Sequence, residues 1–134
     1  MKLSVYTDGW SRWNPWPAGI WVYIVDENHM EIEKRYKYLW EKTNNEAEYT
    51  GALLGIKRAV ELGGTEIDLY MDSKLVIEQL SGKWKIKKSE LQMIHKDIAE
   101  CIANSGIKIV YHWIPREKNK EADRLSNVAM DKQQ

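Results

Sequence analysis

Four acidic residues occupy positions where the ends of separate elements could bring them together. Asp8 and Asp72 each follow a short β-prone segment. Glu48 and Asp123 each lie near the start of a predicted helix. Taken singly, an acid after a strand is often a turn residue, and an acid early in a helix interacts favourably with the helix dipole. Four carboxylates at one spot repel one another unless a cation neutralises them. Oxygen ligands suit Mg²⁺ or Mn²⁺, so the pattern predicts a divalent-metal site.

Hydrophobic periodicity predicts the elements that would hold these acids. Alternating or β-prone segments indicate strands at residues 1–6, 20–25, 32–39, 66–71 and 107–114. Helical spacing indicates helices at residues 43–62, 73–80, 89–105 and 120–130. Thr43 with Glu46, and Ser89 with Gln92, have the form of capping boxes. The expected order of elements is therefore βββαβααβα.

This order favours an α/β fold, a mixed five-stranded sheet flanked by helices. The first three strands have short connections and should form an antiparallel meander. The later strands are separated by helices and should run parallel to the first through right-handed crossovers. Thr7-Asp8-Gly9 predicts a turn that ends the first strand. Asp8 and Asp72 would then stand at neighbouring carboxyl ends, about 5 Å apart, where open α/β sheets have their functional crevice.

The composition excludes several classes of protein. The 134 residues suffice for one domain, and 20 basic against 20 acidic residues exclude a histone-like nucleic-acid binder, though not a local basic patch. Cys101 is the only cysteine, which excludes an internal disulfide and a cysteine-based zinc site. No apolar run reaches the roughly 20 residues of a membrane helix, and the first residues do not form a signal peptide. We therefore expect a cytoplasmic protein without membrane contacts.

A set of short motifs resembles the ribonuclease H type 1 family over nearly the whole chain. The motifs are Tyr6-Thr7-Asp8-Gly9, Asn14-Pro15, Thr43-Asn44-Asn45-x-x-Glu48, Met71-Asp72-Ser73 and Asn119-x-x-x-Asp123. The resemblance implies a single ribonuclease H domain over residues 1–134, in the compact form without a long basic arm. It also implies a metal-dependent endonuclease that hydrolyses the RNA strand of RNA–DNA hybrids and leaves 5′-phosphate and 3′-hydroxyl ends. The catalytic residues, which would also bind two Mg²⁺ (or Mn²⁺) ions, would be Asp8, Glu48, Asp72 and Asp123.

The expected partner is the RNA–DNA hybrid, bound by a monomer. By the resemblance, the amides of Asn14, Asn44 and Asn45 would contact the hybrid in its minor groove, where an amide can meet a 2′-hydroxyl. For Asn44 and Asn45, helix capping is the alternative.

A basic segment at residues 83–88 holds four lysines around Trp84. Such a segment suits contact with phosphates, and Lys83 and Lys85 are the candidate binding residues. The alternative is a solvated connection whose tryptophan packs on the core.

Two other functions fit the sequence less well than the nuclease. A hybrid-binding module on the same fold with impaired catalysis is disfavoured, because a binder has no use for four carboxylates. A flavodoxin-like regulatory domain is disfavoured because its strands would alternate with helices from the start. One departure from the family is the lack of histidine in residues 113–119, where Arg116 or Glu117 could partly take its place.

A second departure concerns tryptophan. Five of the seven tryptophans stand where the family tends to have glycine or another small residue: Trp10, Trp13, Trp16, Trp21 and Trp40. Glycine and tryptophan codons can differ by one base, and some organisms read UGA as glycine. We therefore interpret these residues as a codon-reading artefact or as engineering; an aromatic surface that stacks on nucleic acid is the alternative. The interpretation predicts strained or displaced backbone and exposed indoles in the loop that holds Trp13, Trp16 and Trp21. It also predicts higher stability and cleavage when glycine replaces these three and Trp40.

Overall fold

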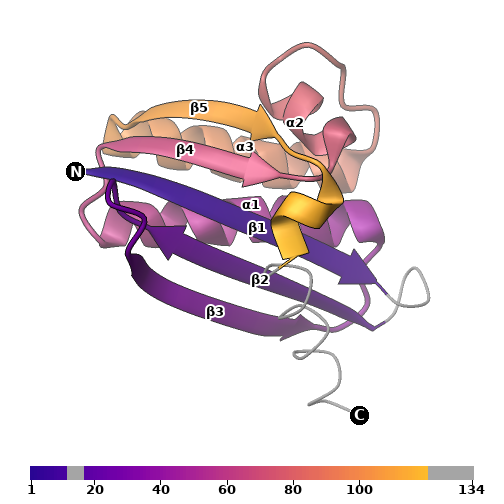
Figure 1. Ribbon diagram of the computed structural model, residues 1–134. Coiled ribbons are helices and arrows are strands. Elements are labelled where there is room, and N and C mark those ends of the chain that lie inside the picture. Colours follow the sequence, from indigo (N-terminus) through magenta and orange to yellow (C-terminus); the bar gives the residue numbers. More distant parts are fainter. Residues whose placement is uncertain (12–16, 121–134) are drawn as a thin grey trace.

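A five-stranded mixed sheet organises the computed structural model, which describes residues 1–11 and 17–120 (Figure 1). The strands are β1 Lys2–Ser11, β2 Ala18–Val25, β3 Glu31–Leu39, β4 Glu66–Met71 and β5 Lys108–Trp113. Their order across the sheet is β3-β2-β1-β4-β5. The first three strands are antiparallel, and β4 and β5 run parallel to β1, which confirms the predicted fold.

Strand β1 is longer than predicted, and the turn expected at Thr7-Asp8-Gly9 is wrong. β1 leaves its parallel neighbour β4 after the pair Tyr6 and Tyr70. It then continues to Ser11 because β2 still pairs with it. Thr7-Asp8-Gly9 therefore marks the point where β4 stops pairing with β1, not the end of β1. Asp8 lies inside β1, opposite Trp21 on β2.

Three helices of the described residues follow the predicted positions: α1 Asn44–Glu61, α2 Lys74–Leu80 and α3 Ser89–Ser105. The capping box of Thr43 and Glu46 is confirmed by reciprocal hydrogen bonds of 3.1 Å. The second box is wrong, because α3 has Lys88 at its N-cap without a side-chain hydrogen bond. None of these helices is long and apolar enough to cross a membrane.

The chain after β5 turns back toward β1. A short 3₁₀ helix, η1, covers Arg116–Asn119. The predicted helix at 120–130 lies outside the described residues except for Lys120, which already has helical conformation.

Helices α1 and α3 cover one face of the sheet (Figure 1). The core between them includes Leu3, Val5, Ile56 and Ile98, each at most 1% exposed. Helix α1 lies very close to β1, because a Cβ atom at Gly55 would come within 2.9 Å of side chains on that strand. This close packing sets the distance between α1 and the sheet. It thereby places Glu48 over the second half of β1.

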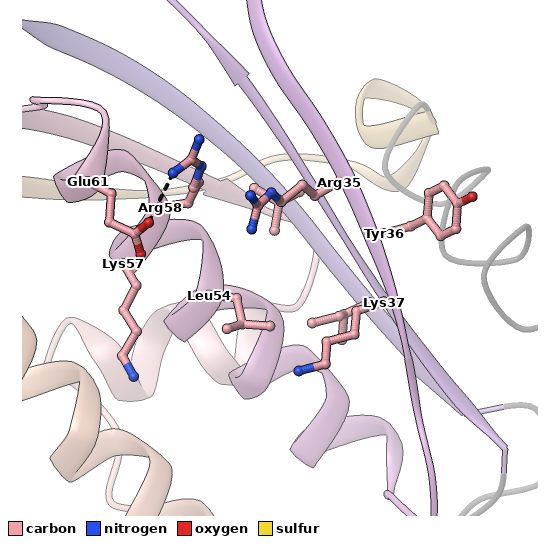
Figure 2. A pocket seen from close by; sticks show the side chains of 9 residues that line it. Arg35, Tyr36, Lys37, Leu54, Lys57, Arg58 and Glu61 are labelled. Carbon is pink, nitrogen blue, oxygen red and sulfur yellow. Dashed lines mark hydrogen bonds and ion pairs between the residues drawn. The ribbon is translucent and has the colours of Figure 1, made fainter.

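Ion pairs tie the edge strand β3 to α1. Arg58 donates to the Glu33 carboxylate from Nε at 2.7 Å and from Nη2 at 2.9 Å. Its Nη1 donates to Glu61 at 2.9 Å, at the rim of a groove of about 240 Å³ between β3 and α1 (Figure 2). The hydrogen bonds from Arg58 hold the pKa of Glu33 below its ordinary value.

We expect Glu33→Gln to lower the melting temperature slightly at pH 7, by less than about 1 kcal/mol in stability. A carboxylate whose pKa is lowered by folding stabilises the protein above its unfolded pKa, and this contribution is lost as the pH falls through the folded pKa. Thermal denaturation at pH 7, 5 and 3 should therefore show a difference from the wild type that disappears at the lowest pH. A difference of constant size would contradict an electrostatic contribution.

Candidate metal and active site

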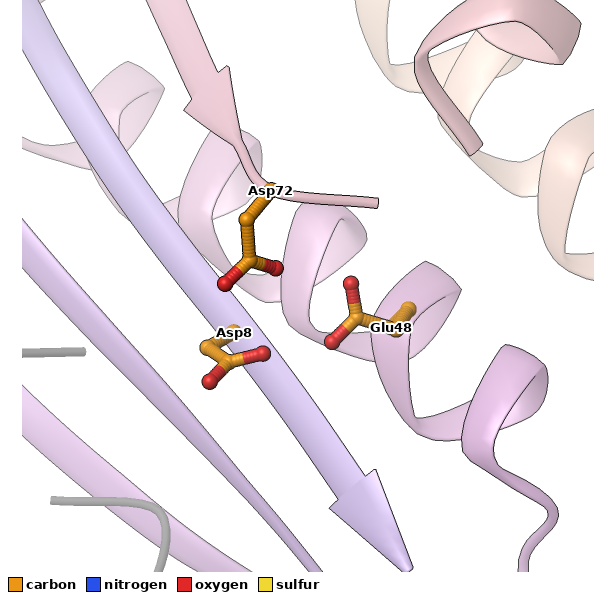
Figure 3. A group of neighbouring side chains, drawn as sticks. All are labelled: Asp8, Glu48 and Asp72. Atoms are coloured by element: carbon orange, nitrogen blue, oxygen red, sulfur yellow. The ribbon is translucent and has the colours of Figure 1, made fainter. Parts of the chain in front are cut away.

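Three of the four predicted carboxylates come together at the carboxyl-end half of the sheet. Asp8 comes from β1, Glu48 from α1, and Asp72 directly follows β4 (Figure 3). One oxygen of each lies within 4.8 Å of the others. Asp8 is 5% exposed and Glu48 is 6% exposed. The fourth residue, Asp123, lies outside the described residues.

Gly9 fixes two of these carboxylates. Its backbone N–H donates to Asp8 Oδ1 at 2.9 Å and to Glu48 Oε1 at 2.6 Å. A Cβ atom at this position would lie 2.2 Å from the backbone carbonyl of Ala47. Only glycine therefore lets α1 approach β1 this closely. Gly9 is therefore not the turn residue predicted from the sequence, and its position beside the candidate ligand Asp8 is the signal that pointed to this role.

The start of α1 is held against β1 by a second contact. The Asn44 side-chain carbonyl accepts a hydrogen bond from the Ser11 backbone N–H at 2.6 Å. The N-cap itself is Thr43, so the capping alternative for Asn44 and Asn45 does not describe their roles. Both asparagines line a cavity of about 270 Å³ together with the three acids. Asn14, the third predicted contact, lies outside the described residues.

The electrostatics of the cluster favour a bound cation. Burial raises the pKa of Glu48 well above its ordinary value, and the nearby Asp8 and Asp72 raise it further. Glu48 Oε2 is buried and has no hydrogen-bond partner. A divalent cation would neutralise the repulsion and give this oxygen a partner, and an all-oxygen donor set is the kind that Mg²⁺ and Mn²⁺ prefer. The residues present therefore fit a divalent metal.

Arg116 contributes a positive charge to the same cavity. Its guanidinium lies 5.6 Å from the centre of the Trp10 ring, within cation–π distance. Glu117 is not among the residues that line this cavity. The neighbouring His112 points elsewhere: its Nε2 lies 2.8 Å from Asp68 Oδ1, and its ring stacks on Tyr70.

Asn119 anchors η1 to the site-bearing strand. Its side-chain amide donates to the Thr7 backbone carbonyl at 3.0 Å, and the residue is 2% exposed. This contact lies in the stretch of β1 that β4 no longer covers.

The basic segment does not reach the carboxylate cavity. Lys83 and Lys85 are exposed in the loop between α2 and α3 and do not line that cavity. Trp84 is 46% exposed, and Ile86 packs against the core instead. The alternative in which the tryptophan packs on the core is therefore wrong.

Trp21 departs from the pattern predicted for the tryptophans. Trp21 is fully buried, so its predicted exposure is wrong. It stacks on Tyr23 at 5.6 Å, and the only non-glycine residue with positive φ among the described residues is His29, so the expected strain at Trp21 is wrong as well. The reason is that position 21 lies in the middle of β2 rather than in a loop. Trp40 is 67% exposed. Trp13 and Trp16 lie outside the described residues.

The chain is similar to several known proteins. The family described as reverse transcriptase-like matches residues 7–129. The chain is 43% identical over 132 residues to a bifunctional protein of Mycobacterium tuberculosis, covering 98% of this chain and 36% of that protein. It is 32% identical over 131 residues to ribonuclease HI of Halobacterium salinarum, covering 97% of this chain and 65% of that protein. The chain thus spans about a third of the length of the first of these relatives.

Solved structures are similar over nearly the whole chain. The N-terminal RNase H domain of the same Mycobacterium tuberculosis protein is 40% identical, with a TM-score of 0.92 and coverage of 97% of this chain and 99% of that one. LC11-RNase H1 in complex with an RNA/DNA hybrid is 36% identical, with a TM-score of 0.93 and coverage of 97% of each chain.

Proposed function

Because the chain belongs to the ribonuclease H type 1 family, we propose that it is a metal-dependent endonuclease that hydrolyses the RNA strand of RNA–DNA hybrids. The products would carry 5′-phosphate and 3′-hydroxyl ends. The observation that carries the proposal is the cluster of Asp8, Glu48 and Asp72, with ligand atoms within 4.8 Å and one buried oxygen without a partner. The solved hybrid complex of a 36% identical relative supports the choice of substrate.

The residues of the cluster would hold the metal, with Asp123 as the fourth proposed ligand. Two bound Mg²⁺ or Mn²⁺ ions would supply activation of water and stabilisation of the leaving 3′ oxygen. The protein contributes orientation: the Gly9 N–H holds one oxygen each of Asp8 and Glu48. Because these oxygens are fixed before substrate binds, the cluster needs little rearrangement to act.

The cavity mouth suits an RNA strand. The Asn44 and Asn45 amides lie beside the carboxylates and can meet 2′-hydroxyls or base edges without reading sequence. Arg116, positioned over Trp10, offers a charge to a phosphate. We further propose that the protein works as a monomer in the cytoplasm, which its single cysteine suits.

A cleavage assay tests this function. We expect a labelled RNA–DNA hybrid to be cut with Mg²⁺ or Mn²⁺ and to stay intact with EDTA. Double-stranded DNA, single-stranded RNA and duplex RNA should be spared, because recognition needs 2′-hydroxyls on one strand and a DNA-like sugar on the other. Equal cutting of duplex RNA would contradict the proposed specificity.

The same assay separates the rival function. A hybrid-binding module would shift the labelled hybrid in a gel with either metal and leave its RNA strand whole. Asp8→Asn provides the matched control, because it removes a proposed ligand while leaving the cavity's shape unchanged.

A further inference from the structure

A buried glutamine connects the helix that carries Glu48 to the lysine-rich loop. Gln79 lies on α2 and is 6% exposed. Its Oε1 accepts a hydrogen bond from the Tyr49 hydroxyl at 2.5 Å, and its Nε2 donates to the Lys85 backbone carbonyl at 3.1 Å. Tyr49 is fully buried and directly follows Glu48 on α1. One side chain therefore spans α1, α2 and the loop that follows α2.

That loop, residues 81–88, is held at several further points and is called the lysine loop below. The backbone N–H groups of Lys83 and Trp84 both donate to the Glu78 carbonyl, at 2.9 and 3.2 Å. Ile86 packs against the core, and its carbonyl accepts a hydrogen bond from Gln92 Nε2 at 2.7 Å. The backbone of the lysine loop is thus fixed by two glutamine amides, Gln79 on one side and Gln92 on the other.

The charges of this loop are available for a ligand. All four of its lysines are exposed: Lys83, Lys85, Lys87 and Lys88. The ion pairs formed among the described residues include none of them. The loop lies toward the same end of the sheet as the carboxyl end of β4 (Figure 1). Four exposed positive charges on a fixed backbone, of which only Lys88 is drawn toward a neighbouring carboxylate, that of Glu90, suit the phosphates of a nucleic acid, since little loop ordering remains to oppose binding.

We propose that Gln79 is a positioning residue that fixes the lysine loop relative to the carboxylate cluster, so that the loop holds phosphates of the hybrid away from the scissile bond. The inference rests on the proposed function, because it concerns the same substrate. The two hydrogen bonds of Gln79 have separate tasks. The bond to Tyr49 attaches the amide to the helix of Glu48, and the bond to Lys85 attaches it to the loop.

Two variants separate these tasks. Gln79→Glu keeps an acceptor for the Tyr49 hydroxyl but, in its ionised form, has no donor for the Lys85 carbonyl. Tyr49→Phe removes the hydroxyl but leaves the bond to Lys85. We expect Gln79→Glu to raise KM for the hybrid about 3- to 10-fold, the loss of roughly one hydrogen bond, with kcat within about twofold of the wild type. Tyr49→Phe should lower the melting temperature and raise KM by less than Gln79→Glu does, because Gln79 keeps its bond to Lys85.

The charge on the loop provides the deciding measurement. In a background with alanine at Lys83, Lys85, Lys87 and Lys88, Gln79→Glu should no longer change KM, because the charges through which Gln79 acts are gone. The slope of log affinity against log salt should be shallower in Gln79→Met, which removes the amide without adding a charge, than in the wild type. Gln92→Leu, which removes the other amide, should also raise KM and serves as an independent variant if Gln79→Glu does not fold.

The outcomes distinguish this inference from the function on which it rests. Equal KM effects of Gln79→Glu with and without the lysines, or a fall in kcat at constant KM, would overturn the positioning role. A wild-type protein that binds the hybrid without cutting it would overturn the nuclease, while hybrid affinity in place of KM would still test Gln79. A wild-type protein that does not bind the hybrid would overturn both.

Discussion

Asp8→Asn protein is expected to bind the hybrid, to cut it at less than about a thousandth of the wild-type rate, and to melt at a higher temperature than the wild type in EDTA. The loss of rate corresponds to about 4 kcal/mol of transition-state stabilisation. The gain in stability follows from removing one of three crowded negative charges, beside a Glu48 whose pKa is raised by burial and by Asp8 and Asp72. Repulsion at these distances is of the order of 1–3 kcal/mol, about several degrees in melting temperature.

The pH dependence of this gain has a definite sign. A carboxylic acid whose pKa is raised by folding costs stability above its folded pKa and costs nothing below its unfolded value of about 4.5. The stabilisation by Asp8→Asn should therefore be largest at alkaline pH, shrink as the pH falls through the raised pKa of Glu48, and vanish below about 4.5. Melting curves in EDTA measure it, and saturating Mg²⁺ should reverse the order by stabilising the wild type.

Asp68→Asn is the matched control for the metal site. Asp68 lies in β4, the strand that Asp72 directly follows. Its carboxylate, however, pairs with His112 and Lys2. This variant should cut the hybrid at the wild-type rate. Loss of activity in both variants, or no rise in melting temperature for Asp8→Asn, would contradict the assignment of the repulsive cluster.

Trp21→Gly is expected to destabilise the protein by about 3 kcal/mol. Removing a fully buried indole leaves a cavity, which lowers the free energy of unfolding by about 3–5 kcal/mol. Glycine inside a strand lowers it by about 0.5–1 kcal/mol more. The Trp21 Nε1 atom is buried without a partner, so its removal returns about 1–3 kcal/mol. The loss of stability from the cavity is larger than the gain from removing the unpartnered N–H. The sequence-based expectation that glycine here raises stability is opposed by the packing.

Two further variants check this balance by chemical denaturation. Trp21→Phe removes the unpartnered N–H and keeps most of the ring, so it should be as stable as the wild type or more stable. Trp40→Gly should change stability by less than about 1 kcal/mol, because that indole is 67% exposed. A stability gain in Trp21→Gly would instead support the interpretation that these tryptophans replace glycines.

The sequence predicted the fold well because its signals were local and redundant. The capping box at Thr43 and the apolar stripe of α1 agree with each other, and the strand order follows from which connections contain helices. The convergence of Asp8, Glu48 and Asp72 followed from the same topology.

What the sequence missed depends on contacts between distant segments. Gly9 looked like a turn residue because its closeness to Ala47 is decided only when α1 packs on β1. The length of β1 depends on pairing with β2 beyond the point where β4 ends. The burial of Trp21 depends likewise on its place in the middle of the sheet.

The bond from Asn119 to the Thr7 carbonyl has a consequence for how the molecule folds. It joins residues 112 positions apart, whereas the β1–β2–β3 meander needs only local contacts. Closure over such a separation is entropically costly and comes after local pairing. The three acids likewise meet only when the end of β4 reaches β1, so their mutual repulsion is absent from the early, meander-containing states. Nascent chains can therefore begin to fold without this electrostatic penalty, and changes within the cluster act chiefly on the rate at which the finished protein unfolds.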